Sequence, residues 1–339
     1  MAAQSMGGMM TTLGRFRVDL LLIVVAASWG STYLVTKELV TPSSVIALLS
    51  VRMLLAAALM AVIVVARRVR TKAVERRRLS RSGLGVGVVL GVLLAAVFVC
   101  ETFGIAHTSA TNAGLIISLT MVFTPILESA VTRRRLPGSF FFAAFVAVVG
   151  VALLADAHAF ETPSLGDLLM LASAVIRAVH VVTMHRLTEG RSDAPASRRP
   201  AVNTLTLTTV QLATCAVLFT VASAFVGDSV PVYLGTLGTD KLALFAYLVV
   251  ICTVFAFFVQ MWAVRRTSPA RVSLLLGTEP LWAAVVGVGI AHDPLDAAAW
   301  CGMLLVLAGT FWGRRIEQRH REGAAQSERK PVLASRRLS

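Results

Sequence analysis

Long apolar runs, separated by short polar segments, occupy this chain from residue 18 to residue 313. Most runs contain about 18 to 25 residues, and a helix of about 20 residues spans the hydrocarbon core of a membrane. The pattern predicts an all-α polytopic membrane protein with ten transmembrane helices. These helices are predicted at residues 18–38, 43–66, 84–106, 110–131, 138–156, 166–186, 203–226, 241–264, 270–291 and 295–313.

The second half of the chain repeats the first. One shift of 159 positions aligns residues 48–62, 109–121 and 136–150 with residues 207–221, 268–280 and 295–309, respectively. The first predicted helix aligns with the sixth under a different shift. Each half holds five helices, and because five is odd the second copy crosses the membrane upside down. Inverted repeats are typical of secondary transporters, whose site lies near the midplane between the halves, although a channel can also be built from them.

This repetition divides the chain into four parts. We expect a cytoplasmic N-terminal segment at residues 1–17, one five-helix repeat at residues 18–156 and a second at residues 166–313. Residues 314–339 form a basic cytoplasmic tail. We expect this tail to begin as a short helix and then to be disordered, because it is polar and mixed in charge.

Composition and charge support a membrane protein, because 56% of the residues are hydrophobic and only 15% are charged. The net charge of +14 does not indicate nucleic-acid binding, since 28 of the 32 lysines and arginines lie in loops and tails on the side of the N-terminus. Cytoplasmic loops carry such an excess, so both termini are predicted to be cytoplasmic. The four cysteines lie in apolar runs without CxxC spacing, so we expect no disulfide framework, metal or cofactor.

Glu279 and Pro280 interrupt the apolar run at residues 268–290 near its midpoint. A carboxylate at that depth costs several kcal/mol unless it faces a cavity or a partner. The proline removes a backbone donor, which predicts a helix break. Pro125 predicts a second break, in the fourth span.

Five segments resemble the EamA-type branch of the drug/metabolite transporter (DMT) superfamily: ASWGSTYLVTK at 27–37, SVRMLLAAAL at 50–59, TSATNAGLIISLTMVFTPIL at 108–127, LGDLLMLASAV at 165–175 and TSPARVSLLLGTEPLWAAVVG at 267–287. The resemblance implies a ten-span carrier of the inner (plasma) membrane that moves amino acids, other small metabolites or drugs, often outward. Arg177 departs from the family, which often has tryptophan there, as this chain has at the matching Trp29. Met121 stands where proline is common.

Arg177 and Glu279 lie near the middle of two different spans, the sixth and the ninth, which predicts a charge pair across a central cavity. In the functional interpretation Arg177 holds a substrate carboxylate or phosphate, while Glu279 binds an amine or exchanges a proton. The alternative is a buried salt bridge that locks these spans together. We favour the functional interpretation, because buried ion pairs contribute little to stability.

Arg52 and Glu101 lie in the outer parts of their spans and are predicted to pair near the external mouth. The repeat places Gln211 and Gln260 at the equivalent positions of the second half. One gate would then be ionic and the other hydrogen-bonded. Glu128 is predicted to reach toward the cations of the following loop.

The remaining candidates for substrate contact are aromatic or hydrogen-bonding residues inside the spans: Trp29, Tyr33, Trp262, Ser31, Asn112, Thr278, His180 and Gln260. The aromatic side chains can enclose a small ligand, or they can face lipid and neighbouring helices. His180 can shuttle protons, although a packed neutral histidine is the simpler interpretation. Asp19 and Asp167 are predicted to cap the N-terminal ends of their helices.

No GxxxxGK[ST], HExxH or GxSxG motif is present, so the sequence indicates neither an ATPase nor an enzyme. We predict a secondary transporter and exporter of a small amino acid or similar zwitterion that works by alternating access. Its partners are this substrate, the lipid bilayer and, if transport is coupled, protons. The protein is a monomer or a homodimer. Alternatives are drug efflux by proton antiport, a membrane-embedded lipid-modifying enzyme and a passive channel.

Overall fold

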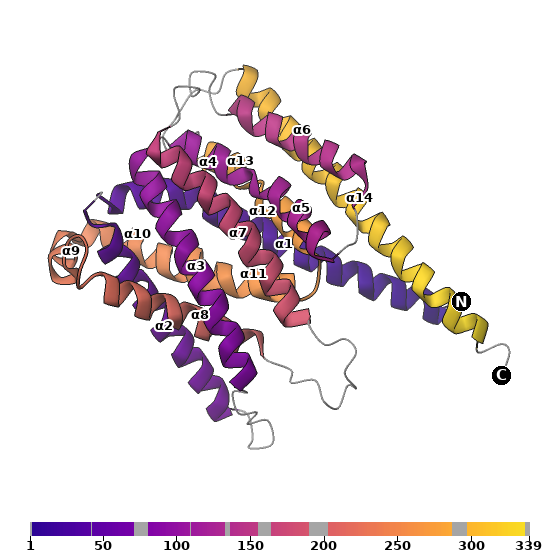
Figure 1. Ribbon diagram of the computed structural model, residues 1–339, viewed down its shortest axis with the longest axis horizontal. Coiled ribbons are helices and arrows are strands. Elements are labelled where there is room, and N and C mark those ends of the chain that lie inside the picture. The colour runs from indigo at the N-terminus through magenta and orange to yellow at the C-terminus, as the bar shows by residue number, and fades with distance from the viewer. Residues whose placement is uncertain are drawn as a thin grey trace.

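A computed structural model describes residues 2–41, 43–70, 81–108, 110–132, 136–154, 164–189, 203–286 and 297–335, and this part of the chain is helical throughout apart from short turns (Figure 1). Each predicted span coincides with one helix or with consecutive helices. The first half contains α1 (Ala2–Leu39), α2 (Val45–Arg70), α3 (Arg81–His107), α4 (Ala110–Ser118), α5 (Thr120–Thr132) and α6 (Gly138–Leu154).

The second half begins with α7 (Leu165–Glu189) and α8 (Thr204–Ala222), followed by the short α9 (Val230–Thr236). The eighth span is α10 (Thr239–Val249), a π-helical segment (Val250–Phe255) and α11 (Ala256–Val264), and the last two spans are α12 (Pro269–Leu276) with α13 (Glu279–Val286), and α14 (Ala297–Ser335). Six stretches of the described chain are long and apolar enough to cross a membrane, and Ile116–Thr132 and Gly138–Leu153 are shorter apolar helices.

Contacts between the helices follow the predicted inverted repeat. Helices α2 and α8 are equivalent and pack on each other, as do α6 and α14 (Figure 1). Helix α3 packs on α7, and the equivalent contact in the other copy packs α1 on α10 and α11. Helices α4 and α5 pack on α7, and their equivalents α12 and α13 pack on α1. Exchanging the halves therefore maps each of these contacts onto another or onto itself.

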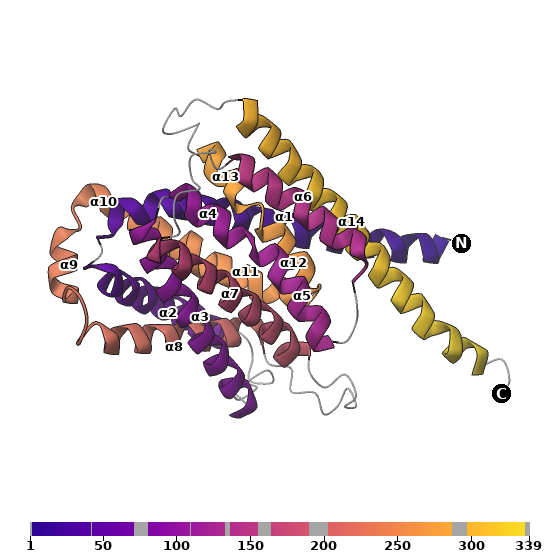
Figure 2. The same ribbon diagram turned by 45° about the horizontal axis from the view of Figure 1, so that its top comes forward.

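Both termini lie at one end of the bundle, and α9 lies at the other (Figures 1 and 2). At the termini end Arg314 of α14 reaches Asp19 of α1, with 2.9 Å between Nη1 and Oδ2. At the α9 end Lys241 donates to the carbonyl of Glu38 at 3.1 Å.

The C-terminal tail differs from the expectation. Helix α14 continues through Ser335, whereas the sequence analysis expected disorder after a short helical start. The extension is rich in alanine, glutamine, glutamate and arginine, which are good helix formers. Glu317 is fully buried and accepts a hydrogen bond from Ser268, which anchors the first turns of the extension.

Glycines allow α6 and α14 to approach backbone to backbone. A Cβ on Gly309 would lie 2.6 Å from the carbonyl oxygen of Ala143 and from the nitrogen of Ala147. Its equivalent in the first repeat, Gly150, would meet the nitrogen of Val306 at 2.6 Å. Small residues permit such close helix contacts in membranes. In contrast, Gly85 of α3 has open space around it.

These two environments give a matched test of packing. Both Gly309→Ala and Gly85→Ala gain helix propensity of roughly 1 kcal/mol. We expect Gly309→Ala nevertheless to lower the free energy of unfolding by about 1–3 kcal/mol, because the methyl group forces α6 and α14 apart, while Gly85→Ala should be neutral or stabilising. Thermal unfolding in detergent measures both. Equal melting temperatures for the two variants would contradict this account of the α6–α14 contact.

Candidate functional site

Two spans are broken at equivalent positions. Helix α12 ends before Thr278 and α13 starts at Glu279, while α4 and α5 are separated at Leu119, which the shift of 159 places on Thr278. Pro280 therefore marks a break, as predicted. Pro125 does not, since it lies inside α5. At both breaks the amide of the central residue bonds three residues back, Leu119 to Ile116 and Thr278 to Leu275, and this tightened turn, rather than Pro125, interrupts the fourth span.

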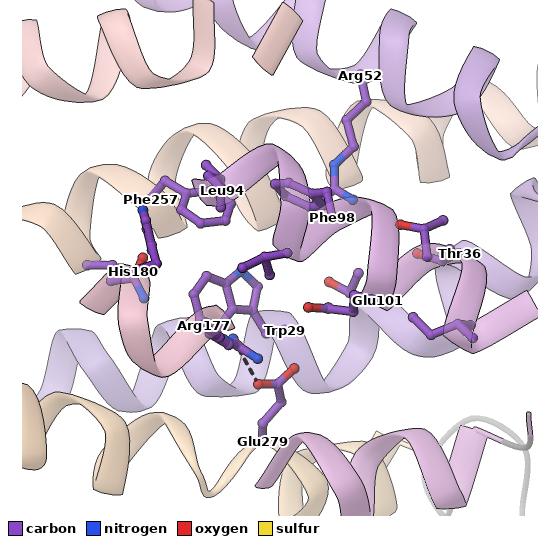
Figure 3. Close-up of a pocket in the computed structure, with 15 residues that line it drawn as sticks. Trp29, Thr36, Arg52, Leu94, Phe98, Glu101, Arg177, His180, Phe257 and Glu279 are labelled. Atoms are coloured by element: carbon purple, nitrogen blue, oxygen red, sulfur yellow. Dashed lines mark hydrogen bonds and ion pairs between the residues drawn. The ribbon is translucent and has the colours of Figure 1, made fainter. Parts of the chain in front are cut away.

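The break in the ninth span places Glu279 opposite Arg177 of α7. Nη2 of Arg177 lies 3.3 Å from Oε2 of Glu279, and the two side chains are 10% and 5% exposed (Figure 3). Tyr33 of α1 donates to Oε1 of Glu279 at 2.9 Å. The structure thus joins the two charges as predicted, and both belong to the second repeat. The phenol of Tyr33, from the first repeat, holds the second carboxylate oxygen.

Trp29 positions the arginine. The guanidinium of Arg177 lies 4.4 Å from the centroid of the Trp29 ring, within the range of a cation–π contact. The indole nitrogen donates to the carbonyl of Cys252 at 3.0 Å. Cys252 belongs to the π-helical segment, and such segments often occur at functional sites. The ring also packs against Phe257, with 5.4 Å between centroids.

Arg52 and Glu101 line the same cavity but are not joined as predicted. Arg52 donates from Nε to Oγ1 of Thr253 at 2.7 Å and lies over the Phe98 ring at 4.9 Å. In the described part of the chain no ion pair links Arg52 to Glu101. The Glu101 carboxylate instead points into the cavity (Figure 3). Sequence position alone could not show that a threonine and an aromatic ring satisfy Arg52.

The cavity formed by these groups is narrow and buried between the repeats. Trp29, Arg52, Glu101, Arg177, His180, Gln260 and Glu279 line it. The volume available to the centres of water molecules is about 30 Å³, which is room for about two waters. A second, smaller space on the other side of Arg177 and Glu279 reaches Pro280 and the α4–α5 break. Arg177 and Glu279 therefore line both spaces.

Several predicted contact residues lie elsewhere. Ser31 shares a hydrogen bond with Tyr247 at 2.8 Å, and the hydroxyl of Thr278 donates to the carbonyl of Leu275 at 2.7 Å. The Trp262 ring lies under Arg266 at 4.2 Å. None of these three predicted residues lines either cavity described here. The side chain of Asn112 lies outside the described residues.

Sequence reasoning missed an ionic cluster at the termini end. Arg271 of α12 forms a bidentate pair with Asp19 of α1, at 2.9 Å to Oδ1 and 2.8 Å to Oδ2, and lies 3.8 Å from Oε2 of Glu317. Arg314 joins the same aspartate. Asp19 is therefore an ion-pair residue rather than the predicted helix cap, because α1 starts far ahead of it. The signal available in the sequence was that Asp19 aligns with Asp167 in the repeat.

Two other acidic residues satisfy helix ends. Asp167 accepts from the backbone nitrogen of Ser164 at 2.9 Å and from Thr108 at 2.5 Å, while Ser164 accepts from the nitrogen of Asp167. This reciprocal arrangement is a capping box, as predicted for Asp167. Glu128 accepts from the nitrogen of Ala270 at 2.7 Å, at the start of α12. The loop arginines predicted as its partners lie outside the described residues.

Fold and cavity together define a class: a multi-pass membrane protein built from inverted repeats around a polar site. Comparison with known families places the chain within that class. The family model described as the EamA-like transporter family matches residues 16–155 and 164–313. The chain therefore belongs to the EamA-like transporter family, whose members are transporters rather than enzymes.

Individual relatives support the fold and the family. An uncharacterized transporter of Archaeoglobus fulgidus is 24% identical over 233 residues, which are 67% of this chain and 74% of the relative. A crystal structure of another protein superposes with a TM-score of 0.67 at 16% identity, covering 89% of this chain and 98% of that one. At this identity the structure shows the fold alone.

The ionic cluster generates a prediction about stability. We expect Arg271→Gln to lower the free energy of unfolding by about 3–5 kcal/mol, because the buried Asp19 loses its bidentate guanidinium and keeps only its contact with Arg314. The double variant Asp19→Asn, Arg271→Gln should recover part of this loss, since one uncompensated charge is removed as well. Arg315→Gln changes an exposed arginine of α14 and serves as the control. Thermal unfolding in detergent compares them, and an Arg271→Gln curve that matches the control would refute the assignment.

Proposed function

We propose that this transporter is a secondary carrier of a small zwitterion, such as an amino acid, and that the cavity at Arg177 and Glu279 is its substrate site. The observation that carries the proposal is the balance of charge in the cavity: two guanidinium groups and two carboxylates line one narrow buried space. Such groups are costly at membrane depth and are found where substrates or ions pass. Positive and negative side chains placed side by side suit a ligand that carries both a positive and a negative group.

The contacts suggest separate roles for the four charges. Arg177 is the cation available to a substrate carboxylate, because its link to Glu279 is a single contact at 3.3 Å. Arg52 is held by Thr253 and Phe98, which suits a structural role at the α9 end of the cavity. Glu101 has no ion pair within the described chain and points into the space, so it suits an ammonium group. This assigns the amine to Glu101 rather than to Glu279, which Arg177 and Tyr33 already hold.

Transport requires the cavity to open. Room for about two waters is less than a metabolite needs, so substrate entry has to separate the groups around the ion pair. Alternating exposure toward the two ends follows from the inverted repeat. We propose that the termini face the cytoplasm, as the distribution of arginine and lysine indicates, and that the carrier exports its substrate. A proton on Glu279 is the simplest coupling ion if transport is coupled.

Replacement of Arg177 tests the site against the salt-bridge alternative. We expect the neutral double variant Arg177→Leu, Glu279→Leu to insert and fold but to lose at least about 100-fold in kcat/KM, a loss of roughly 2.7 kcal/mol. A purely structural pair would tolerate this double change. Amino-acid counterflow into proteoliposomes gives the rate. Arg266→Leu, which removes a cation from a comparable stack on Trp262, is the matched control, and undiminished counterflow in the double variant would exclude this substrate site.

Replacement of Glu101 tests the polarity of binding. We expect Glu101→Gln to raise the KM for valine at least about tenfold, because the ammonium loses its counter-charge inside a buried cavity. Inhibition by 3-methylbutanoate, which lacks the amine, should change little. Competition in the same counterflow assay measures both constants. If the two ligands weaken together, Glu101 holds the cavity in shape and does not select the amine.

A further inference from the structure

Two consecutive arginines directly follow α11, at the start of the turn that leads to α12. Arg265 donates from Nη1 to Oγ1 of Thr204, the first residue of α8, at 2.8 Å. The guanidinium of Arg266 lies 4.2 Å from the centroid of the Trp262 ring. Within the described part of the chain, neither arginine forms an ion pair. The structure thus holds two neighbouring positive charges together without a described carboxylate to balance them.

The charge on this pair affects Arg265 directly. Burial of Arg265 and the positive charge of Arg266 both lower the pKa of the Arg265 guanidinium. The side chains of residues 189–202, which lead to α8, lie outside the described structure. The sequence gives this segment three arginines and two acidic residues, and therefore no surplus of negative charge. Because like charges at a partly buried position repel each other, an anion from outside the chain would stabilise the pair.

A second pair of consecutive arginines at the termini end is balanced within the chain. Arg314 and Arg315 both lie over the Phe311 ring, with 5.3 Å and 4.3 Å between guanidinium carbon and ring centroid. Arg314 also forms an ion pair with Asp19 at 2.9 Å. In both pairs an aromatic residue stands four positions before the second arginine, so the described structures of the two pairs differ chiefly in the carboxylate. This difference identifies the pair at 265–266 as the one that needs an external anion.

The pair at 265–266 lies where a membrane span ends. The apolar stretch of the eighth span is Thr239–Val264, so Arg265 is the first residue beyond it. Ser268, in the same turn, donates to Glu317 of the ionic cluster at the termini end, at 2.6 Å. Tryptophan is enriched at the level of the lipid headgroups, and Trp262 is only partly buried. These positions place the pair at the membrane surface at the termini end of the bundle.

We propose that Arg265 and Arg266 bind the headgroup phosphate of an anionic phospholipid. Arginine suits this ligand because its planar group of N–H donors matches the oxygens of a phosphate. Soluble phosphate offers the same oxygens, but the position at the end of a span favours a ligand that is anchored in the bilayer. The site lies outside both cavities and goes beyond the proposed function. Its loss is expected to change lipid binding and not counterflow, so each proposal can fail without the other.

The experiment compares two lipids on the purified full-length protein. Native mass spectrometry gives the dissociation constant of the first bound lipid for phosphatidylglycerol and for phosphatidylcholine, which carries a phosphate but no net charge. We expect phosphatidylglycerol to bind roughly 25-fold tighter, about fivefold for each arginine. Arg266→Gln should lower this ratio about fivefold, and the double variant Arg265→Gln, Arg266→Gln should bring it near one. Arg315→Gln, from the balanced pair, is the matched control and should leave the ratio intact.

Three results would overturn the site. One is equal binding of the two lipids by the unaltered protein, and another is an unchanged ratio in the double variant. A third is an equal loss in Arg315→Gln, since binding would then follow total charge rather than this pair. Arg266 is exposed, so Arg266→Gln decides the question even if the double variant does not fold. Displacement of phosphatidylglycerol by an excess of inorganic phosphate would overturn the lipid assignment in favour of a soluble ion.

Discussion

The contact between Arg177 and Glu279 is the constraint on which the rest of the site depends. Two charges at the depth of the hydrocarbon core are costly unless each is compensated. Glu279 is compensated by Arg177 and Tyr33, and Arg177 by Glu279 and the Trp29 ring. These four residues come from α1, α7 and the start of α13, so the ionic contact lies within the second repeat, and Tyr33 and Trp29 tie it to the first. The break before Glu279 and the π-helical segment that anchors Trp29 are the backbone irregularities that make this arrangement possible.

The two repeats have equivalent helices, but the polar residues at equivalent positions differ between them. The fold keeps the same inter-helix contacts in both copies, because packing depends on small residues such as Gly150 and Gly309 that remain in register. The polar residues have diverged, with Arg52 and Glu101 on one side against Gln211 and Gln260 on the other. The two repeats thus combine a symmetric packing of helices with an asymmetric distribution of charged and polar residues.

The two ends of the bundle are closed by different interactions. At the termini end Asp19 binds two arginines, whereas at the α9 end the equivalent Asp167 bonds a threonine hydroxyl and caps its own helix. Asp19 and Asp167 therefore share a position in the repeat, but Asp19 binds cationic side chains while Asp167 accepts from an amide and a hydroxyl.

Sequence by itself determined the membrane class, the helices, the five-plus-five inversion and the pair of charges at mid-depth. It did so because apolar length, loop charge and internal alignment are local properties of the chain. It also gave the break beside Pro280 but placed a second break wrongly at Pro125, because the tightened turn that interrupts both spans does not require a proline. Only the tertiary structure decided that Arg52 bonds Thr253 rather than Glu101, that Asp19 pairs with Arg271, and that Ser31, Trp262 and Thr278 lie off the cavity. Those outcomes depend on the rotation of each helix about its axis, and in spans that are apolar on nearly every side the sequence carries too little periodicity to fix that rotation.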